Sequence, residues 1–388
     1  MKFNSKFWII VIIEGLMVCG YSLSFPFLAI YLTQNRGFNM SITGLYFSIL
    51  ILISSFSSIL GGTLSDYLGR KKIMFYSLFV RGVFVIAITF CINYNLNPLW
   101  ILFFNFMSSI SGLGFHPVAM AYISDIVDEK DRIKAYSVLR VSTNAGWASG
   151  PALGGFLSNI SYSLAFGVSS VVFIFASFLV LLKIREFNNN RVEVQKIMSI
   201  SNFSSQFKRL LFLSFFLASV MSQLVVPLSL YSKKYLGFSE KDIGFLFTLN
   251  GLIVVFFQYF VGSKIKEESL SKTISLSCLL YASGYLLFGY SDNYYMAIIS
   301  IIIVTIGEVI LSPSVSSFVI KLSPSSRKGL YMGVHSMISD FGRAFGVFMG
   351  TFIIDKFSIY FREASWYFVF LISLMSSYGF LIIERKKS

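Results

Sequence analysis

The sequence GGTLSDYLGRKK, residues 61–72, lies between two long apolar runs. Glycine and polar residues interrupt hydrophobic sequence there, which predicts a tight turn between two membrane-spanning helices. We expect Gly62 to permit close approach of two backbones, Gly69 to adopt a positive φ, and Asp66 to lie where a helix ends. The basic residues that close the stretch resist translocation, as they would in any ordinary cytoplasmic loop.

The composition excludes a soluble globular domain. The 388 residues are 55% hydrophobic and only 13% charged, with a mean hydropathy of +0.73, whereas soluble domains carry about 25% charged residues. Apolar runs of roughly 20 or more residues are long enough to cross the hydrocarbon core of a bilayer. Twelve such runs predict an all-α membrane protein with twelve transmembrane helices, at 7–33, 41–65, 73–96, 98–124, 135–158, 161–183, 210–232, 243–263, 273–290, 293–321, 330–354 and 365–383.

Basic residues predict the orientation. With the N-terminus inside the cell, 23 of the 32 Lys and Arg residues fall in cytoplasmic segments, six in external loops and three within spans. The sequence therefore predicts a multi-pass protein of the cell membrane with both termini cytoplasmic. The topological bias and attraction to anionic membrane lipids together explain the net charge of +14. Membrane lipids are therefore expected partners, and nucleic acid is not.

The chain divides at a polar, basic run that we interpret as a cytoplasmic linker, residues 185–209. It separates an N-terminal bundle of six helices, 1–184, from a C-terminal bundle of six, 210–388. Glycines and prolines recur between the halves at shared offsets of 200 and 196 residues, which indicates an internal repeat. Six spans per repeat give a pseudo-two-fold axis along the membrane normal, with the substrate expected between the repeats.

The spacing G-x-L-x-D-x-x-G-R-K within residues 62–71 resembles the signature loop of the major facilitator superfamily. The resemblance implies a loop between spans two and three that acts as a conformational latch. It implies that Asp66 and Arg70 make the contacts that hold the latch closed. The residues of the latch are Gly62, Asp66, Gly69, Arg70 and Lys71. The sequence lacks the basic residue often found after the aspartate, and the second repeat carries a degenerate copy at Gly262, so the latch is expected to be asymmetric.

The fifth span contains NAGWASGPALGG, residues 144–155. Its small residues form a smooth helix face for close packing, and the proline weakens the backbone hydrogen bonding locally. The pattern also resembles the G-x-x-x-G-P-x-x-G-G motif of drug:proton antiporters, which implies efflux, although some relatives with glycine-rich fifth spans import. The residues of this helix-packing motif are Gly146, Gly150, Pro151, Gly154 and Gly155.

Ionisable residues inside spans are costly, at about 2.5–3.5 kcal/mol each at the bilayer centre, and usually serve a cavity or a partner. One interpretation is that acids and bases simply pair to hold helices together. The other is that a carboxylate titrates during transport. Our candidates for proton coupling are, in order, Glu308, Asp340 and Glu14. Asp340 ranks below Glu308 because Arg343, three residues later, would neutralise it. The expected charge partners within the spans are Arg81, Arg140 and Arg343.

The antiporter pattern is incomplete. The resemblance would place an arginine four residues before Gly112, where this chain has Ser108, so Arg81 or Arg140 would have to substitute. His116 and His335 are read as hydrogen-bonding residues, with proton relay as the alternative. The chain also lacks the E-x-x-E-R motif of proton-coupled peptide transporters, yet its tenth span resembles theirs, which keeps peptide uptake as the alternative function.

Aromatic residues make up 18% of the chain, and together with a buried carboxylate they suit lipophilic cations. The expected substrate cavity contains Tyr21, Phe25, Tyr31, Tyr231 and Asn144.

The sequence contains none of the common hydrolase or nucleotide-binding motifs, so an enzyme is not expected, and neither is a cofactor or a metal site. We predict a monomeric secondary transporter that works by alternating access and exports amphipathic or lipophilic small molecules in exchange for protons. A non-transporting membrane sensor is the remaining alternative, and it would usually carry a signalling domain.

Overall fold

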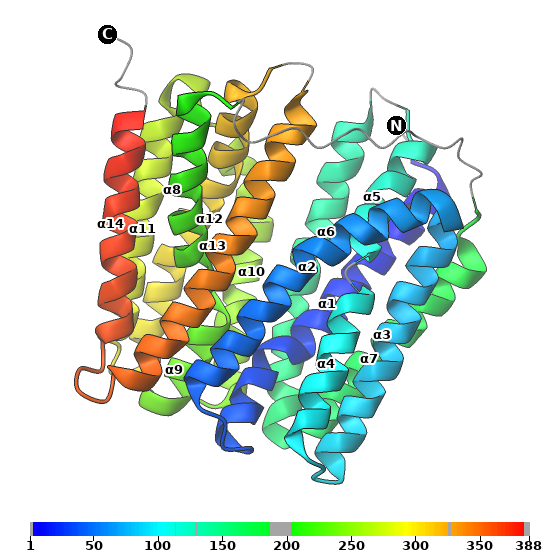
Figure 1. Cartoon of the computed structure of the whole chain (residues 1–388), viewed down its shortest axis with the longest axis horizontal. Coiled ribbons are helices and arrows are strands. Elements are labelled where there is room, and N and C mark those ends of the chain that lie inside the picture. Colours follow the sequence, from blue (N-terminus) through cyan, green and yellow to red (C-terminus); the bar gives the residue numbers. More distant parts are fainter. Residues whose placement is uncertain (1–2, 113, 129–130, 187–202, 325–326, 384–388) are drawn as a thin grey trace. The chain divides into compact units, whose positions relative to one another are not determined.

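The computed structural model describes residues 3–112, 114–128, 131–186, 203–324 and 327–383. Within these ranges the chain is helical, with short turns between long helices (Figure 1). The α-helices are α1 Ser5–Gln34, α2 Met40–Leu68, α3 Arg70–Asn93, α4 Pro98–Gly112, α5 Phe115–Ile126, α6 Arg132–Ile160, α7 Tyr162–Lys183, α8 Ser205–Met221, α9 Val226–Tyr235, α10 Glu240–Gly262, α11 Leu270–Gly289, α12 Tyr294–Leu322, α13 Lys328–Lys356 and α14 Ala364–Ile383.

These helices supply the twelve predicted spans. The fourth span is broken into α4 and α5, and the seventh into α8, a 3₁₀ turn at Ser222–Leu224 and α9. Ten segments of the described chain are long and apolar enough to cross a membrane. The other two spans, α6 and α11, have 29 and 20 residues and are less apolar because glycine and hydroxyl residues replace aliphatic ones.

The helices form two compact units. The first comprises residues 1–32, 53–195 and 239–251, and the second comprises 33–52, 196–238 and 252–388. In the first unit α3 packs against α4 and α7, and in the second α11 packs against α12 and α14 (Figure 1). The division that the sequence predicts, at residues 185–209, stays a prediction, since 187–202 lie outside the described residues.

Glycines on α6 bring it against α1 within the first unit. A Cβ atom added to Gly146 would lie 2.7 Å from the carbonyl oxygen of Gly15, and one added to Gly150 would lie 2.7 Å from that of Cys19. Gly154 meets the α1 backbone in the same way one turn further along. The small-residue face of the fifth span thus packs closely, as the sequence pattern suggests, and it fixes where the α1 side chains point.

Candidate functional site

The fourth span breaks where α4 ends at Gly112 and α5 begins at Phe115. Next to this break, Gly61 of α2 lies so close to Gly114 that a Cβ atom on Gly61 would overlap the Gly114 backbone. The close approach that we expected at Gly62 therefore occurs at Gly61, because a Cβ on Gly62 would meet nothing within 4 Å.

Glu14 of α1 and His116, the second residue of α5, form a hydrogen-bonded pair at this break. The Oε1 atom of Glu14 lies 2.6 Å from Nδ1 of His116. The glutamate is completely buried, whereas half of the histidine side chain is exposed. Among the described residues, Oε2 of Glu14 has no hydrogen-bond partner. A buried carboxylate with one oxygen unsatisfied is costly unless it carries a proton or receives a ligand.

Arg81 of α3 is a second buried charge in the same unit, with 5% of its surface exposed. Its guanidinium carbon lies 5.0 Å from the ring centres of both Tyr21 and Phe173. Nη1 lies 3.9 Å from the sulfur of Met17, which is three residues after Glu14 on α1. No carboxylate of the described residues forms an ion pair with Arg81, so two aromatic rings provide its main stabilising contacts.

Gly112 provides the room for the Arg81 guanidinium. A Cβ atom on this glycine would overlap the guanidinium carbon and two of its nitrogens, Nη1 and Nε. The sequence resemblance places an arginine one turn before Gly112, at Ser108, which is buried with 3% of its surface exposed. The Arg81 guanidinium, which extends from α3, thus lies against the end of α4, one turn beyond the position where the resemblance expects an arginine.

Aromatic residues continue along the same face of α1. Tyr21 follows Met17 by one turn, and its ring stacks on that of Phe25 with centroids 4.6 Å apart. Trp147 of α6 meets the Tyr21 ring edge-on at 6.1 Å. All three side chains are half-buried. The first unit thus places a buried carboxylate, a buried cation and half-exposed aromatic rings on neighbouring turns.

The second unit has an internal ion pair on α13. Arg343 donates from Nη2 to Oδ1 of Asp340 at 2.5 Å, three residues away on the same helix. This is the pairing that the sequence suggested for Asp340. Arg343 and His335 also line a cavity of about 150 Å³ between α8, α12 and α13, where Nε2 of His335 lies 3.1 Å from the hydroxyl of Ser214.

Glu308 of α12 is half-buried. It lies close enough to Tyr281 and Tyr285 of α11 to interact with them electrostatically, and both tyrosines are buried. Gly307 beside it packs against α11, since a Cβ there would lie 3.2 Å from the carbonyl oxygen of Ser277. Our first sequence candidate for coupling therefore faces a tyrosine-rich helix interface within the second unit.

The signature loop forms a network of charges. Arg70 donates from Nε to Oδ2 of Asp125 at 2.5 Å, and its Nη1 lies 3.5 Å from Oδ1 of Asp66. Gly69 has φ of +100°, as the sequence predicted. The Glu186 carboxylate lies against Gly69 and accepts from the backbone nitrogen of Lys71 at 3.2 Å. These acids tie the loop between α2 and α3 to the ends of α5 and α7.

The remaining predicted residues have other contacts. Tyr231 is completely buried and donates its hydroxyl to the carbonyl of Gly289 at 2.8 Å. Tyr31 is buried against the ring of Tyr162, with centroids 5.0 Å apart. Asn144 is half-buried and Arg140 is exposed, both on α6. The contacts of the two tyrosines are those of packing residues.

Two partners in these clusters were weakly signalled by the sequence. His116 stands out only as one of two histidines, and its contact with Glu14 spans 102 positions. Asp125 lies in the last turn of α5, and no motif in the sequence marks it as the partner of Arg70. Glu186 carries no motif that would have found it.

Twelve spans and ionisable residues buried within two of them, Glu14 of α1 and Arg81 of α3, define a membrane transport protein. The family description "Major Facilitator Superfamily" matches residues 10–347 and 211–383. The chain belongs to that superfamily, as its signature loop indicated, and is a transporter rather than an enzyme.

Relatives of similar length share about a quarter of its residues. The uncharacterized MFS-type transporter YttB of Bacillus subtilis is 25% identical over 376 residues, which cover 95% of this chain and 93% of YttB. The quinolone resistance protein NorA of Staphylococcus aureus is 23% identical, with 91% and 90% covered. A POT family transporter solved with a thioalcohol-conjugated peptide has the same fold, with a TM-score of 0.82 at 15% identity and 98% and 96% covered.

Proposed function

We propose that the chain is a proton-coupled antiporter that exports amphipathic or lipophilic compounds by alternating access. It would act as a monomer in the cell membrane, with both termini in the cytoplasm. The observation that carries this proposal is the buried Glu14 carboxylate, held by a half-exposed His116 at 2.6 Å.

A proton can reside on this pair in two ways. If the proton lies on the carboxyl group, both partners are neutral, and if it lies on the imidazole, they form an ion pair within one hydrogen bond. Because His116 is half exposed and Glu14 is buried, the imidazole is the group through which a proton would reach the carboxylate. This is the role expected of a histidine in a proton relay.

The aromatic residues beside the pair suggest the substrate class. Tyr21 and Phe25, two and three turns along α1 from Glu14, form a half-buried cluster with Trp147 of α6. Aromatic faces and a nearby carboxylate together attract a lipophilic cation. In the antiport cycle that we propose, such a compound and a proton compete for Glu14, so that binding of one releases the other. The relationship to NorA, whose name assigns it to quinolone resistance, supports export.

Arg81 would serve as the basic residue of this cycle in place of the missing arginine at Ser108. Its guanidinium lies against the end of α4 and contacts Met17 and Tyr21 on the Glu14 face of α1. Binding of a compound at Tyr21 would therefore change the contacts of Arg81 directly.

We place Glu14 ahead of Glu308 and Asp340 as the coupling residue. Asp340 already has a cation three residues away, and Glu308 is only half-buried. Both stay candidates because each lies inside a span, where a charge is costly.

The test uses the purified chain in proteoliposomes with an imposed pH gradient, following a fluorescent lipophilic cation. We expect cation movement opposite to proton flow, and we expect Glu14→Gln to abolish the dependence on the gradient. Glu268→Gln, an exposed carboxylate in the 3₁₀ helix Glu267–Ser269, is the control and should transport normally. Normal gradient-driven transport by Glu14→Gln, together with its loss in Glu308→Gln or Asp340→Asn, would move coupling to the second unit.

Proton-coupled peptide uptake is the second candidate function. Arg81 favours it, because a buried cation with no carboxylate partner among the described residues could bind the carboxylate of a peptide. A labelled dipeptide is followed in the same proteoliposomes. Dipeptide movement with protons, lost in Arg81→Gln, would establish uptake and contradict the export proposal.

A further inference from the structure

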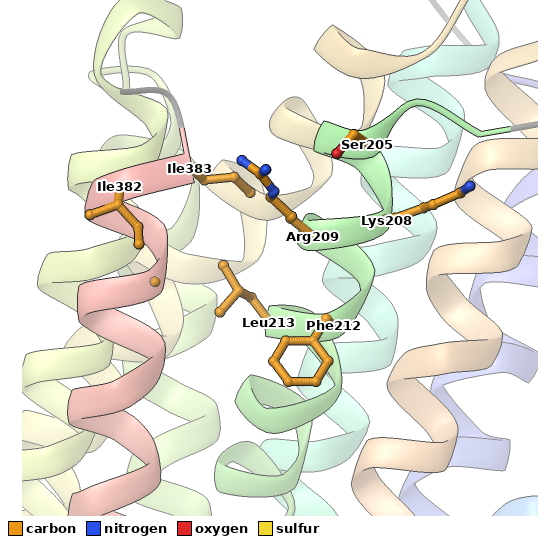
Figure 2. A pocket seen from close by; sticks show the side chains of 8 residues that line it. Ser205, Lys208, Arg209, Phe212, Leu213, Ile382 and Ile383 are labelled. Carbon is orange, nitrogen blue, oxygen red and sulfur yellow. The ribbon is translucent and has the colours of Figure 1, made fainter. Parts of the chain in front are cut away.

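A groove in the second unit, independent of the transport site, lies between the first turns of α8 and the last turns of α14 (Figure 2). Its volume is about 650 Å³, within the usual range of small-ligand sites. Ser205, Lys208, Arg209, Phe212 and Leu213 line it from α8, and Gly379, Ile382 and Ile383 line it from α14.

The deep part of the groove is apolar. Leu213 points from α8 toward α14 (Figure 2), where a Cβ atom on Gly379 would overlap its side chain. The two helices therefore touch at this glycine. Phe212 is 64% exposed and Ile382 40% exposed, so the walls of the groove present apolar surface outward. In a membrane this surface faces lipid chains.

The shallow part of the groove is cationic. Lys208 and Arg209 are both exposed and lie one turn from Phe212 and Leu213, which is about 6 Å along the helix axis. The Arg209 side chain extends toward the end of α14, whereas Lys208 points away from it (Figure 2). Among the described residues no acidic side chain lines the groove, and Arg209 has no ion-pair partner. Cations in the first turns of a helix gain nothing from the helix dipole.

We propose that this groove binds an anionic phospholipid. The phosphate would lie against Arg209 at the mouth of the groove, with Lys208 adding positive charge at the same helix end, and one acyl chain would run along Phe212 and Leu213 toward Gly379. The order of groups in the groove, cations at the helix end and apolar side chains one turn deeper, matches the order of phosphate and acyl chain in a lipid. In the predicted topology this end of α8 is cytoplasmic, the side where anionic lipids gather and where basic pockets between spans bind their headgroups.

The test is native mass spectrometry of the full chain in detergent with dioleoyl-phosphatidylglycerol or dioleoyl-phosphatidylcholine. The two lipids have the same acyl chains, so their difference reports the headgroup. We expect the phosphatidylglycerol to be retained preferentially. Lys208→Gln/Arg209→Gln should weaken that binding about thirtyfold, from the usual contribution of two basic residues at an anionic surface.

Arg327→Gln/Lys328→Gln is the matched control, an exposed basic pair at the start of α13. It removes the same charge from the unit and should leave lipid binding unchanged. Lys208→Arg/Arg209→Lys should also retain binding, which separates loss of charge from misfolding. The proposed site would be wrong if both charge-removing variants lost phospholipid binding equally. It would also be wrong if the wild-type protein bound the two lipids equally.

A soluble headgroup separates a lipid site from a phosphate site. Glycerol 3-phosphate at the same concentration should not displace the phospholipid, because it lacks the acyl chain. Displacement at equal concentration would show that the cations bind phosphate alone. Phe212→Ser should weaken phospholipid binding with both cations in place, and unchanged binding by this variant would contradict the acyl-chain position.

Discussion

Replacing Gly112 by alanine should displace the Arg81 guanidinium and destabilise the protein. The added methyl group would overlap the guanidinium carbon, and the guanidinium cannot simply swing into solvent because Arg81 is only 5% exposed. It would have to leave the rings of Tyr21 and Phe173, each 5.0 Å away. Overpacking of this kind costs about 1–3 kcal/mol of the free energy of unfolding.

Gly167→Ala is the matched control. Gly167 is also a helical glycine of the first unit, but a Cβ there meets only Thr89 Cγ2 at an ordinary 3.7 Å. Alanine should stabilise the interior of α7 by about 1 kcal/mol. We therefore expect Gly112→Ala to be less stable than Gly167→Ala by about 2–4 kcal/mol, measured by denaturant titration of the purified proteins in one detergent.

A double-mutant cycle shows whether Arg81 is the cause. Arg81→Ala removes the group that the methyl would strike, so Gly112→Ala should cost less in that background, with an interaction energy above about 0.5 kcal/mol. Equal stability of the two glycine variants, or additive effects of Gly112→Ala and Arg81→Ala, would refute the placement of Arg81 against α4.

Three further outcomes are expected. Gly69→Ala should lose about 1–2 kcal/mol because its φ is +100°. Gly62→Ala, within α2 and with open space around it, should instead gain about 1 kcal/mol from helix propensity; thermal unfolding of both in parallel checks this. Asp125→Asn should lower stability by about 1.5–3 kcal/mol, since Arg70 is only 8% exposed and would lose a charged hydrogen-bond partner. Stability equal to that of the wild type would exclude this contact. Tyr231→Phe should cost about 1 kcal/mol, one hydrogen bond, with unchanged substrate affinity; a large loss of affinity at normal stability would instead make Tyr231 a binding residue.

Much of the fold follows from local sequence. Each apolar run long enough to cross a bilayer is a helix or a broken helix, because backbone groups in lipid must satisfy one another within the segment. The positive φ of Gly69 and the end of α2 at Leu68 follow from the turn chemistry of residues 61–72. The Asp340–Arg343 pair is also local, since three residues place both side chains on one helix face.

The partners of the buried charges are long-range and were not determined by the sequence alone. Glu14 and Arg81 are recognisable as costly charges inside spans. Nothing in the neighbouring sequence indicates that Glu14 pairs with His116 or that aromatic rings surround Arg81. The break between α4 and α5 and the close approach of Gly61 and Gly114 set these contacts. They depend on how α1, α2, α3 and α5 pack, which no single run of sequence specifies.

The sequence by itself determined the spans, the signature loop and the list of charged residues that need explaining. Only the tertiary structure decided which of those charges are paired between helices, which lie against aromatic rings, and where a basic pair meets an apolar groove between α8 and α14. The physical reason is that hydropathy and turn chemistry act between neighbours along the chain. Desolvated charges, in contrast, are stabilised by whichever groups the packed helices bring within a few ångströms.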